Sequence, residues 1–293
     1  MNEHEGKHRF LGKPLLRNFA WRSGTPRGFT LVELLLVLVV GTICMAAAYP
    51  LLWGFFGTFS QNDDYVTAQE NAYNGLLAMG QAVLLGGLGM PAGAVPAAVG
   101  KTATPLSGVV SVNASQDQLT VIWSTPLGAV APQRVISPGG GGKIFLTSNL
   151  MGKLRVGDMV VFPPTRCFFQ VRALDAAGVT LAVVSGDAPV EQFSELHKVE
   201  VSRFYVDLSD HTLRRDDAWG GKNQPLLGGL WGLSVDVVSG GRAVEATLLG
   251  GSNQVFSRPL AQDVPGWSRT LPANDRRFVA MRKIWRVRNW TDQ

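Results

Sequence analysis

The chain has 293 residues, of which 46% are hydrophobic and 17% charged, which is enough for one sizeable domain and an anchor. Its net charge of +5 is unevenly placed, because residues 1–28 carry six Lys/Arg against two Glu, a net +4 that leaves +1 for the remainder. The basic isoelectric point therefore says little about binding partners. Neither the two cysteines, Cys44 and Cys167, nor the four histidines show metal-ligand spacing, so we expect no metal site and no cofactor.

A hydrophobic run follows the basic leader. Between Phe29 and Asn62 the only charged residue is Glu33. The 21 residues Phe29–Tyr49 would form about 32 Å of helix, which matches the hydrocarbon core of a bilayer. Positively charged flanks stay in the cytoplasm. We therefore expect the rest of the chain across the membrane, in the periplasm of a Gram-negative cell.

Glu33 is unusual in such a run. A charged side chain costs roughly 2.5–3.5 kcal/mol at the centre of a membrane helix and less towards the interface, so we expect Glu33 to have a partner. The alternative is a plain signal-anchor helix with an accidental glutamate. An ordinary secretory signal fits less well, because its apolar core is shorter and its cleavage site follows that core.

The sequence Gly-Phe-Thr-Leu-Val-Glu at residues 28–33, followed by leucines, resembles the prepilin signal of type IV pilins and type II secretion pseudopilins. The resemblance implies that a prepilin peptidase cuts after Gly28 and that the new terminal residue, Phe29, is N-methylated. It implies that Glu33 pairs with an amino terminus during assembly. The implied partners are major and minor pilins and the inner-membrane assembly platform, and the implied location is a single-pass inner-membrane protein that later enters a filament.

Gly41 and Pro50 interrupt the apolar run. Proline removes a backbone donor and crowds the preceding turn, so we expect a kink or local melting there. A tolerated membrane-helix proline is the simpler interpretation. The family resemblance implies instead that the helix loosens between the two residues within a filament.

Residues 51–90 read as a helix that continues out of the membrane. Apolar residues recur in it at three- and four-residue steps, which predicts an amphipathic helix covered by a sheet. These residues are Tyr65, Ala68, Ala72, Leu76, Met79, Val83 and Leu84. A second membrane span over residues 75–99 is disfavoured by its glycines and by Pro91 and Pro96. The stretch Gln69–Ala72 with its following Leu-Leu pair resembles a helix of PilW-type minor pilins.

Short strand-like runs separated by turn-forming residues follow a Gly/Pro/Ala linker. The runs are 109–113, 119–123, 143–147, 158–162, 167–173, 179–184, 199–207, 233–238, 243–249 and 278–289. The predicted class is α+β, with one long N-terminal helix packed on a mostly antiparallel sheet. The expected organisation is a leader (1–28), a transmembrane and assembly helix (29–50), an amphipathic helix (51–90) and a β-rich head (91–293).

Two further stretches extend the resemblance into the head. Residues 154–171 resemble a pair of strands of PilW-like proteins, and residues 204–230 resemble a segment that these proteins share with J-type pseudopilins. Gly229 replaces the glutamate usual in that segment. These stretches imply hairpin strands with a buried face, and hence a fold rather than a chemistry.

Other candidate sites are weak. The run Gly139–Gly142 lacks the spacing of a phosphate-binding loop and is interpreted as a flexible loop. Four aspartates, at 207, 210, 216 and 217, lack the spacing of a calcium-binding loop and are interpreted as a solvated turn. No Ser-His-Asp or Cys-His arrangement is apparent, although residues distant in sequence could still converge.

The C-terminal stretch 276–290 is basic and carries two tryptophans. We expect an edge strand with a basic outer face, with alternate residues from Val279 to Val287 facing inward. The alternative is a nucleic-acid surface with stacking aromatics. Its candidate contacts are Arg282, Lys283, Arg286 and Arg288.

Taken together, these patterns predict a minor pilin or pseudopilin of the PilW or J type that primes or caps a filament. The protein is expected to be a substrate of the prepilin peptidase and not an enzyme itself. One alternative is a DNA- or surface-binding tip pilin that uses strand 276–290. A weaker alternative is a membrane-anchored periplasmic enzyme.

Overall fold

The computed structural model describes residues 28–91, 95–99, 104–129, 141–144, 152–163, 167–175, 178–185, 195–217 and 223–288. The chain divides into two compact units, residues 1–56 and residues 57–293. We describe each unit separately. The leader, except for Gly28, lies outside the described residues.

The helix α1 (Leu31–Leu85) supplies all of the described secondary structure of the first unit and continues into the second. Pro50 lies inside it, and residues on both sides of Gly41 and Pro50 keep helical backbone. Loosening of this segment within a filament stays a prediction. The helix ends at Leu85, five residues before the expected boundary of 90. Gly87 and Gly89 follow with φ of 76° and 66°, a left-handed backbone that ends helices.

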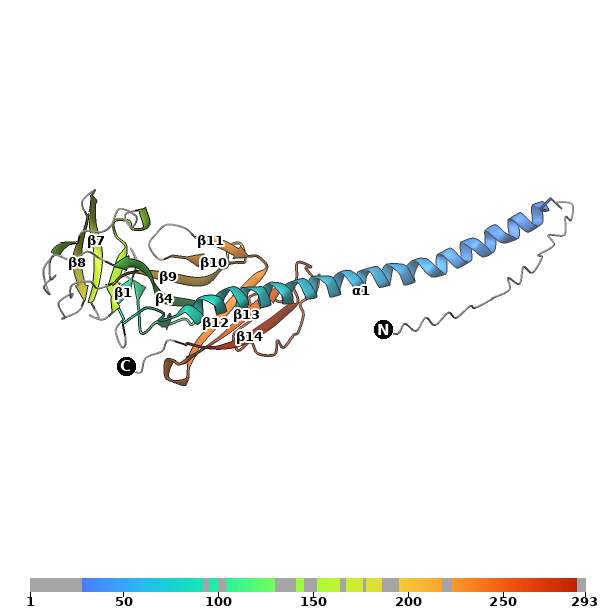
Figure 1. Cartoon of the computed structure of the whole chain (residues 1–293). Helices are drawn as coiled ribbons and strands as arrows, with labels where there is room; N and C mark the ends of the chain where they lie inside the picture. Colours follow the sequence, from blue (N-terminus) through green and yellow to red (C-terminus); the bar gives the residue numbers. More distant parts are fainter. Residues whose placement is uncertain are drawn as a thin grey trace, which may run out of the picture. The chain divides into compact units, whose positions relative to one another are not determined.

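The second unit is built from antiparallel strands, as the sequence predicts (Figure 1). Its larger sheet has nine strands. Seven follow the order β11-β10-β9-β6-β7-β8-β5, and outside this path β4 pairs with β9 and β3 pairs with β4. The strands of this sheet are β3 (Val110–Val112), β4 (Gln118–Ala129), β5 (Gly141–Ile144), β6 (Met159–Phe162), β7 (Cys167–Asp175), β8 (Gly178–Ser185), β9 (Glu195–Asp207), β10 (Thr212–Asp216) and β11 (Gln224–Leu227).

Strand β9 organises this sheet. One edge of β9 pairs with β4 along nearly its whole length. The other edge pairs with β10 through residues 203–207 and with β6 through residues 197–198. A small separate ladder joins β1 (Ala98–Val99) to β2 (Thr104–Pro105). Neither β1 nor β2 is among the predicted strands.

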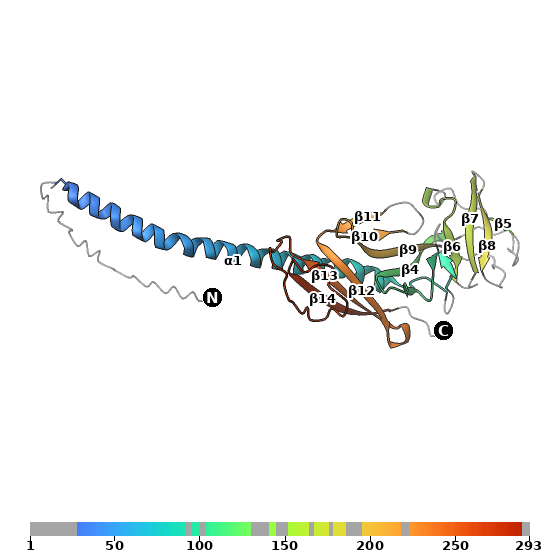
Figure 2. The same cartoon turned by 180° about the vertical axis from the view of Figure 1, so that it is seen from behind.

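A second sheet holds three strands in the order β12-β13-β14. They are β12 (Leu230–Val238), β13 (Ala243–Gly251) and β14 (Phe278–Arg286), and a short 3₁₀ turn, η3 (Ser239–Gly241), joins the first two. Figure 2 shows the last turns of α1 lying along this sheet and beside β4. Within the second unit the helix therefore packs on sheet, which is the predicted α+β arrangement.

Two glycines allow α1 and the three-stranded sheet to pack closely against each other. A Cβ atom on Gly80 would lie 2.3 Å from Nε1 of Trp285, and one on Gly250 would lie 2.3 Å from the carbonyl oxygen of Ala68. Both positions therefore require glycine for a packing reason rather than for an unusual backbone angle.

The main core contains the buried stripe of α1. Ala72, Leu76, Met79 and Val83 are at most 1% exposed and pack against strands of both sheets. Ala68 is also buried, so the predicted stripe is confirmed for these five residues. The prediction is wrong for Tyr65 and Leu84, which are about 40% exposed because they lie off the sheet-facing side of the helix.

Two smaller cores serve other parts of the head. One fills the space among β6, β7, β8 and the neighbouring ends of β4 and β9, with Phe162 and Phe169 in edge-to-face contact at 5.5 Å. The other lies under the long connection between β13 and β14 and includes Val264 and Phe278.

Most predicted strands are present, and several are longer than predicted. The glycine run 139–142, which we interpreted as a flexible loop, differs from the prediction. Gly141 and Gly142 belong to β5 and pair with Leu181 and Ala182 of β8, so the loop interpretation is wrong for them. Pairing to a neighbouring strand supplies the order that composition alone does not indicate. Gly139, Gly140 and the end of predicted strand 143–147 lie outside the described residues.

Candidate processing and assembly site

The bond between Gly28 and Phe29 lies in an exposed segment just before α1. Neither residue has helical backbone, and Phe29 is 83% exposed. A Cβ atom on Gly28 would meet no other atom within 4 Å. Nothing in the described chain therefore requires glycine at position 28. A requirement for it would have to come from a molecule that approaches this bond, such as a peptidase.

Thr30 and Glu33 form a reciprocal cap at the start of α1. The backbone N–H of Thr30 and its hydroxyl each donate to Oε2 of Glu33, both at 3.0 Å. In return, the backbone N–H of Glu33 donates to Oγ1 of Thr30 at 3.2 Å. This is a capping box, which satisfies backbone donors at a helix N-terminus. The spacing Thr-x-x-Glu is visible in the sequence, but our sequence interpretation did not use it.

The cap explains how Glu33 is accommodated before any partner arrives. Its two hydrogen bonds both use Oε2, and no described residue donates to Oε1. The second oxygen is thus free to accept from an amino group. Cleavage after Gly28 would create such a group on Phe29, one residue before the cap. Another chain's amino terminus could equally approach.

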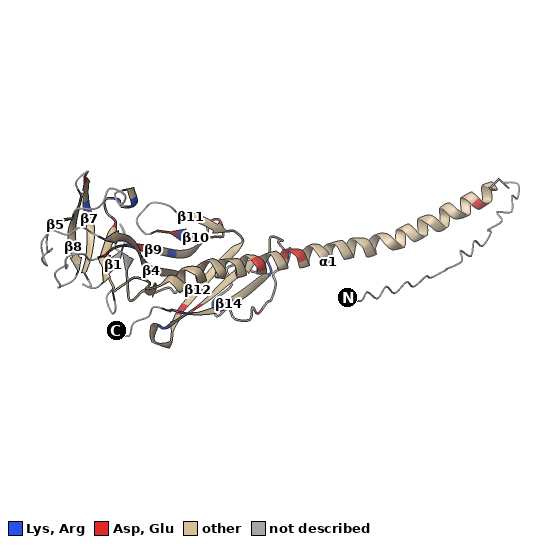
Figure 3. Ribbon diagram, in the orientation of Figure 1, with Lys and Arg blue, Asp and Glu red and all other residues tan. Residues whose placement is uncertain are grey.

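The first part of α1, residues 31–56, has an almost entirely apolar exterior. Every residue from Gly28 to Phe56 is exposed, and Figure 3 shows a single acidic residue near the start of this part. Its mean hydropathy reaches 2.5 over an 18-residue window, none of which is buried. Among the described helices, α1 alone is long and apolar enough to cross a membrane. This helix fits a membrane-anchored protein with a head domain.

The structure divides the predicted basic contacts of β14. Val279, Trp285 and Val287 are buried and Ile284 is exposed, which confirms the predicted alternation. Arg286 and Arg288 lie on the exposed side, as does Arg282, which forms an ion pair with Glu245 of β13. Lys283 lies on the opposite side, with its Nζ 5.6 Å from the centroid of the Tyr73 ring. The four cations therefore do not form one surface.

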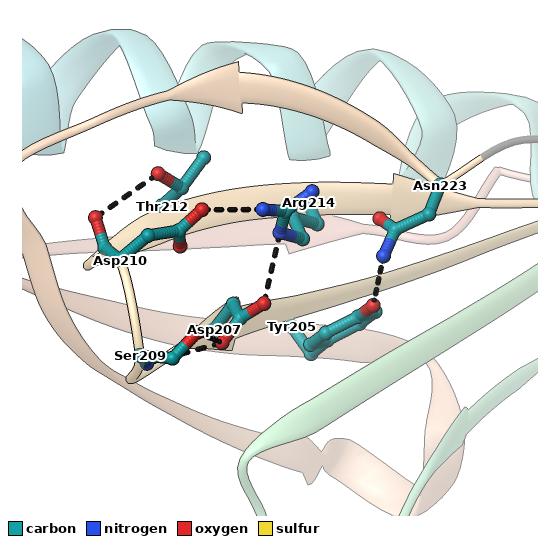
Figure 4. Close-up of polar contacts among 7 residues, drawn as sticks. All are labelled: Tyr205, Asp207, Ser209, Asp210, Thr212, Arg214 and Asn223. Carbon is teal, nitrogen blue, oxygen red and sulfur yellow. Dashed lines mark hydrogen bonds and ion pairs between the residues drawn. The ribbon is translucent and has the colours of Figure 1, made fainter.

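The acidic hairpin between β9 and β10 is an ion-pair network (Figure 4). Arg214 pairs with Asp210 and, through Nε at 3.0 Å, with Asp207. Hydrogen bonds from the Ser209 hydroxyl and N–H hold the pKa of Asp207 below its usual value. The Asp210 carboxylate raises the pKa of Arg214.

The other aspartates of this segment lie apart from that network. Asp216 pairs with Arg203 across the ladder. Among the described residues there is no group of three or more His, Cys, Asp or Glu side chains that could hold a metal ion. Arg214 compensates the carboxylates of Asp207 and Asp210, and Arg203 compensates that of Asp216.

Ser124 of β4 does converge with two residues of β9 that are distant from it in sequence, His197 and Glu195. The Ser124 hydroxyl lies 3.1 Å from Nδ1 of His197, whose Nε2 lies 3.5 Å from a carboxylate oxygen of Glu195. The serine is 1% exposed, however, and it donates its hydroxyl hydrogen to the Gly89 carbonyl at 2.6 Å. Its geometry is that of a clamp on the glycine-rich turn rather than of an accessible nucleophile.

The comparison with protein families agrees with the predicted processing site at Gly28 and Phe29. Residues 26–49 match the prokaryotic N-terminal methylation motif. No curated protein and no solved structure matches the chain. The motif indicates a type IV pilin-like or pseudopilin protein, and it implies processing by a prepilin peptidase and assembly with other pilins.

Proposed function

We propose that this chain is a minor subunit that primes or caps a type IV pilus or pseudopilus after cleavage between Gly28 and Phe29. The observation that carries the proposal is the apolar part of α1. None of the described residues covers it, it starts just after an exposed glycine, and its single acid is Glu33. Such a helix needs lipid before assembly and neighbouring helices after it.

The size of the head favours a minor role. The mature chain would hold the 265 residues 29–293, and the described part of its second unit contains three sheets and three separate cores. If subunits stack through their N-terminal helices, every head must fit between its neighbours at a short axial rise. A bulky head meets less crowding at a tip, where one side has no neighbour.

Gene deletion and protein counting test this role together. We expect deletion to reduce filament number sharply, and quantitative proteomics of purified filaments to find this protein far below the most abundant pilin. A subunit present at parity with that pilin would contradict the minor role while leaving the processing site intact.

Two other functions receive less support. A nucleic-acid surface on β14 would depend on Arg286 and Arg288, since Arg282 is paired with Glu245 and Lys283 lies over Tyr73. A hydrolase centred on Ser124 would need a nucleophile that is neither buried nor donating to backbone. We therefore retain assembly, and not catalysis, as the proposed role.

A further inference from the structure

The three-stranded sheet has an edge that no described strand covers, because its order is β12-β13-β14. The N–H of Val287 donates to Arg242, the residue before β13, whereas the N–H of Phe278 donates to the Gln262 side chain. Backbone N–H groups alternate in direction along an antiparallel strand, and β14 pairs with β13 without a register shift. The N–H groups that point away from β13 are therefore those of Ala280, Arg282, Ile284 and Arg286.

This open edge is long and regular. No described residue accepts a hydrogen bond from its outward N–H groups. The strand has no bulge, and at its centre the side chain of Ile284 is 55% exposed. Bulges and short length are common ways in which proteins prevent pairing at a sheet edge. The edge of β14 can therefore accept another strand.

A second observation is an exposed apolar stripe on α1, separate from its buried stripe. Spacings of seven, four and seven residues place its members within about 40° of one line along the helix. Each member is between 38% and 48% exposed. The members are Val66, Tyr73, Leu77 and Leu84.

The exposed stripe lies on the side of α1 next to the open edge. Gly75 lies against a leucine of β13 and Gly80 against a tryptophan of β14. The helix turns through about 140° from Gly75 to Gly80, and Leu77 lies about 60° further in the same direction. At the border, Nζ of Lys283 is 5.6 Å from the centroid of the Tyr73 ring. The apolar face of α1 is therefore wider than the three strands that cover it.

We infer that β14 accepts an extended segment from the head of a neighbouring pilin subunit, which pairs with the open edge and covers the exposed stripe of α1. The inference rests on the proposed assembly role. The segment would turn apolar residues towards Tyr73 and Leu77. Its other face would carry an acid, because Arg286 and Arg288 are exposed there and have no acidic partner among the described residues.

Other occupants fit less well. Residues 289–293 span at most about 18 Å. Residues 280–286 of the edge extend over about 23 Å, so the C-terminal segment is too short to cover them. The leader carries a net +4, which the arginines of β14 would repel. Pairing between β14 strands of two copies would bring their arginines together, and like charges disfavour such a pair.

Amide hydrogen exchange of the tagged full-length protein tests the pairing. The protein is extracted in the same mild detergent from a host that makes the other pilins and from a host that makes only the peptidase. In the protein made alone, the outward N–H groups of Arg282 and Ile284 should exchange at least about 100-fold faster than the inward groups of Met281 and Lys283. In complexes with pilins, exchange of the outward groups should slow at least about tenfold.

Variants in matched pairs test the two parts of the surface. Ile284→Pro removes an outward N–H, which an edge strand tolerates, whereas Ile284→Thr keeps it. The amount of co-purified pilin should fall about tenfold with the proline and less than about twofold with the threonine. Leu77→Gln should reduce it about threefold. Leu85→Gln, at a leucine of similar exposure about 80° around the helix, should leave it unchanged.

Slow exchange of the inward groups verifies the fold of each variant. If Ile284→Pro does not fold, exchange in the wild type and the amount of pilin bound to Leu77→Gln decide. Co-purified pilins with unprotected outward groups, or equal co-purification with the wild type and the folded proline variant, would overturn this inference alone. Protection in the protein made alone would also overturn it, because the strand would then come from this chain or a second copy. Absence of any co-purified pilin would contradict the assembly role and the inference together.

Discussion

The two parts of α1, residues 31–56 and 57–85, differ in composition and in surroundings, because the first is almost entirely apolar and the second carries polar and acidic residues as well. In the first part, Leu34 and Val40 are 58% and 50% exposed, whereas in the second Leu76 and Met79 are at most 1% exposed. The second part has a buried apolar stripe, and its Gly75 and Gly80 lie against Leu248 and Trp285. In the first part, apolar residues surround the helix on all sides, and Cβ atoms on Gly41 and Gly54 would meet no described atom within 4 Å.

The difference shows that the head covers the apolar stripe of the second part of α1 but not the first part. The stripe around Leu76 and Met79 is covered by the head's own sheets, so it serves the fold of the second unit. The first part has no covering of its own, and a contiguous apolar surface of this kind marks a membrane or protein contact. The predictions below act on one part at a time, with a matched change in the same helix as control.

The largest effect is expected from Gly28→Val. Since a Cβ atom added at position 28 meets no described atom within 4 Å, folding should be unchanged while the peptidase loses access to the backbone. We expect processing to fall from complete to undetectable, measured as retention of the larger precursor on immunoblots. Gly41→Val, which also meets no neighbour, should be processed normally. Normal processing of Gly28→Val would contradict the proposed cut site.

Glu33→Leu should have the next largest effect. An unpaired carboxylate has a high free energy in hydrocarbon, and a charged amino terminus that pairs with it during assembly would lower that free energy. We expect the variant to be processed and retained in the membrane but to be at least about tenfold depleted from sheared filaments, which corresponds to roughly 1.4 kcal/mol. Glu70→Leu, at an exposed acid of the second part, should enter filaments. Equal incorporation of both variants would remove the assembly role of Glu33.

Gly28 and Glu33 were singled out from sequence because a glycine before an apolar run and a lone acid within that run are local patterns that need no tertiary partner. The match of residues 26–49 to the N-terminal methylation motif agrees with this pattern, and the roles of the two residues stay predictions. The buried stripe of α1 was also predictable from its period, except at Tyr65 and Leu84, whose burial depends on the position of the sheet.

Other features depend on contacts between residues far apart in the chain. Ser124 and His197 meet only because β4 pairs with β9, and Gly141 joins a strand only because β8 lies beside it. Arg203, Trp231 and Trp267 line one pocket although they come from three separate segments of the chain. The spacing of apolar residues along the chain does not indicate which distant strands pair.

Glycine-to-alanine changes in α1 sharpen the comparison between its two parts. Gly80→Ala places a methyl group against Trp285, and overpacking of this kind costs about 1–3 kcal/mol. Thermal unfolding of the detergent-solubilised protein should shift down by about 2–4 °C per kcal/mol. Gly54→Ala meets nothing and should not destabilise the head. Equal shifts from the two changes would mean that the head does not depend on close packing at Gly80.

The smallest expected effect concerns pH. Burial, followed by the nearby Arg276, lowers the pKa of His211, which stacks on Trp231 at 3.5 Å. The unfolded chain therefore takes up a proton near pH 6.5 while the folded chain does not, so stability should fall as pH drops below about 6.5, until the lowered pKa is passed.

His211→Asn isolates this contribution. The residue has φ of 54°, a backbone conformation that Asn tolerates. Between pH 7.5 and 5, the urea midpoint of the wild type should fall more than that of the variant. Parallel losses in the two proteins would show that His211 does not titrate in this window.

The most direct test of the account is the mass of the N-terminal peptide of the wild-type protein from membranes of a host with an active prepilin peptidase. The account predicts a chain that begins at Phe29 and carries one added methyl group on its amino nitrogen. A chain that still begins at Met1 in that host would contradict the prepilin assignment.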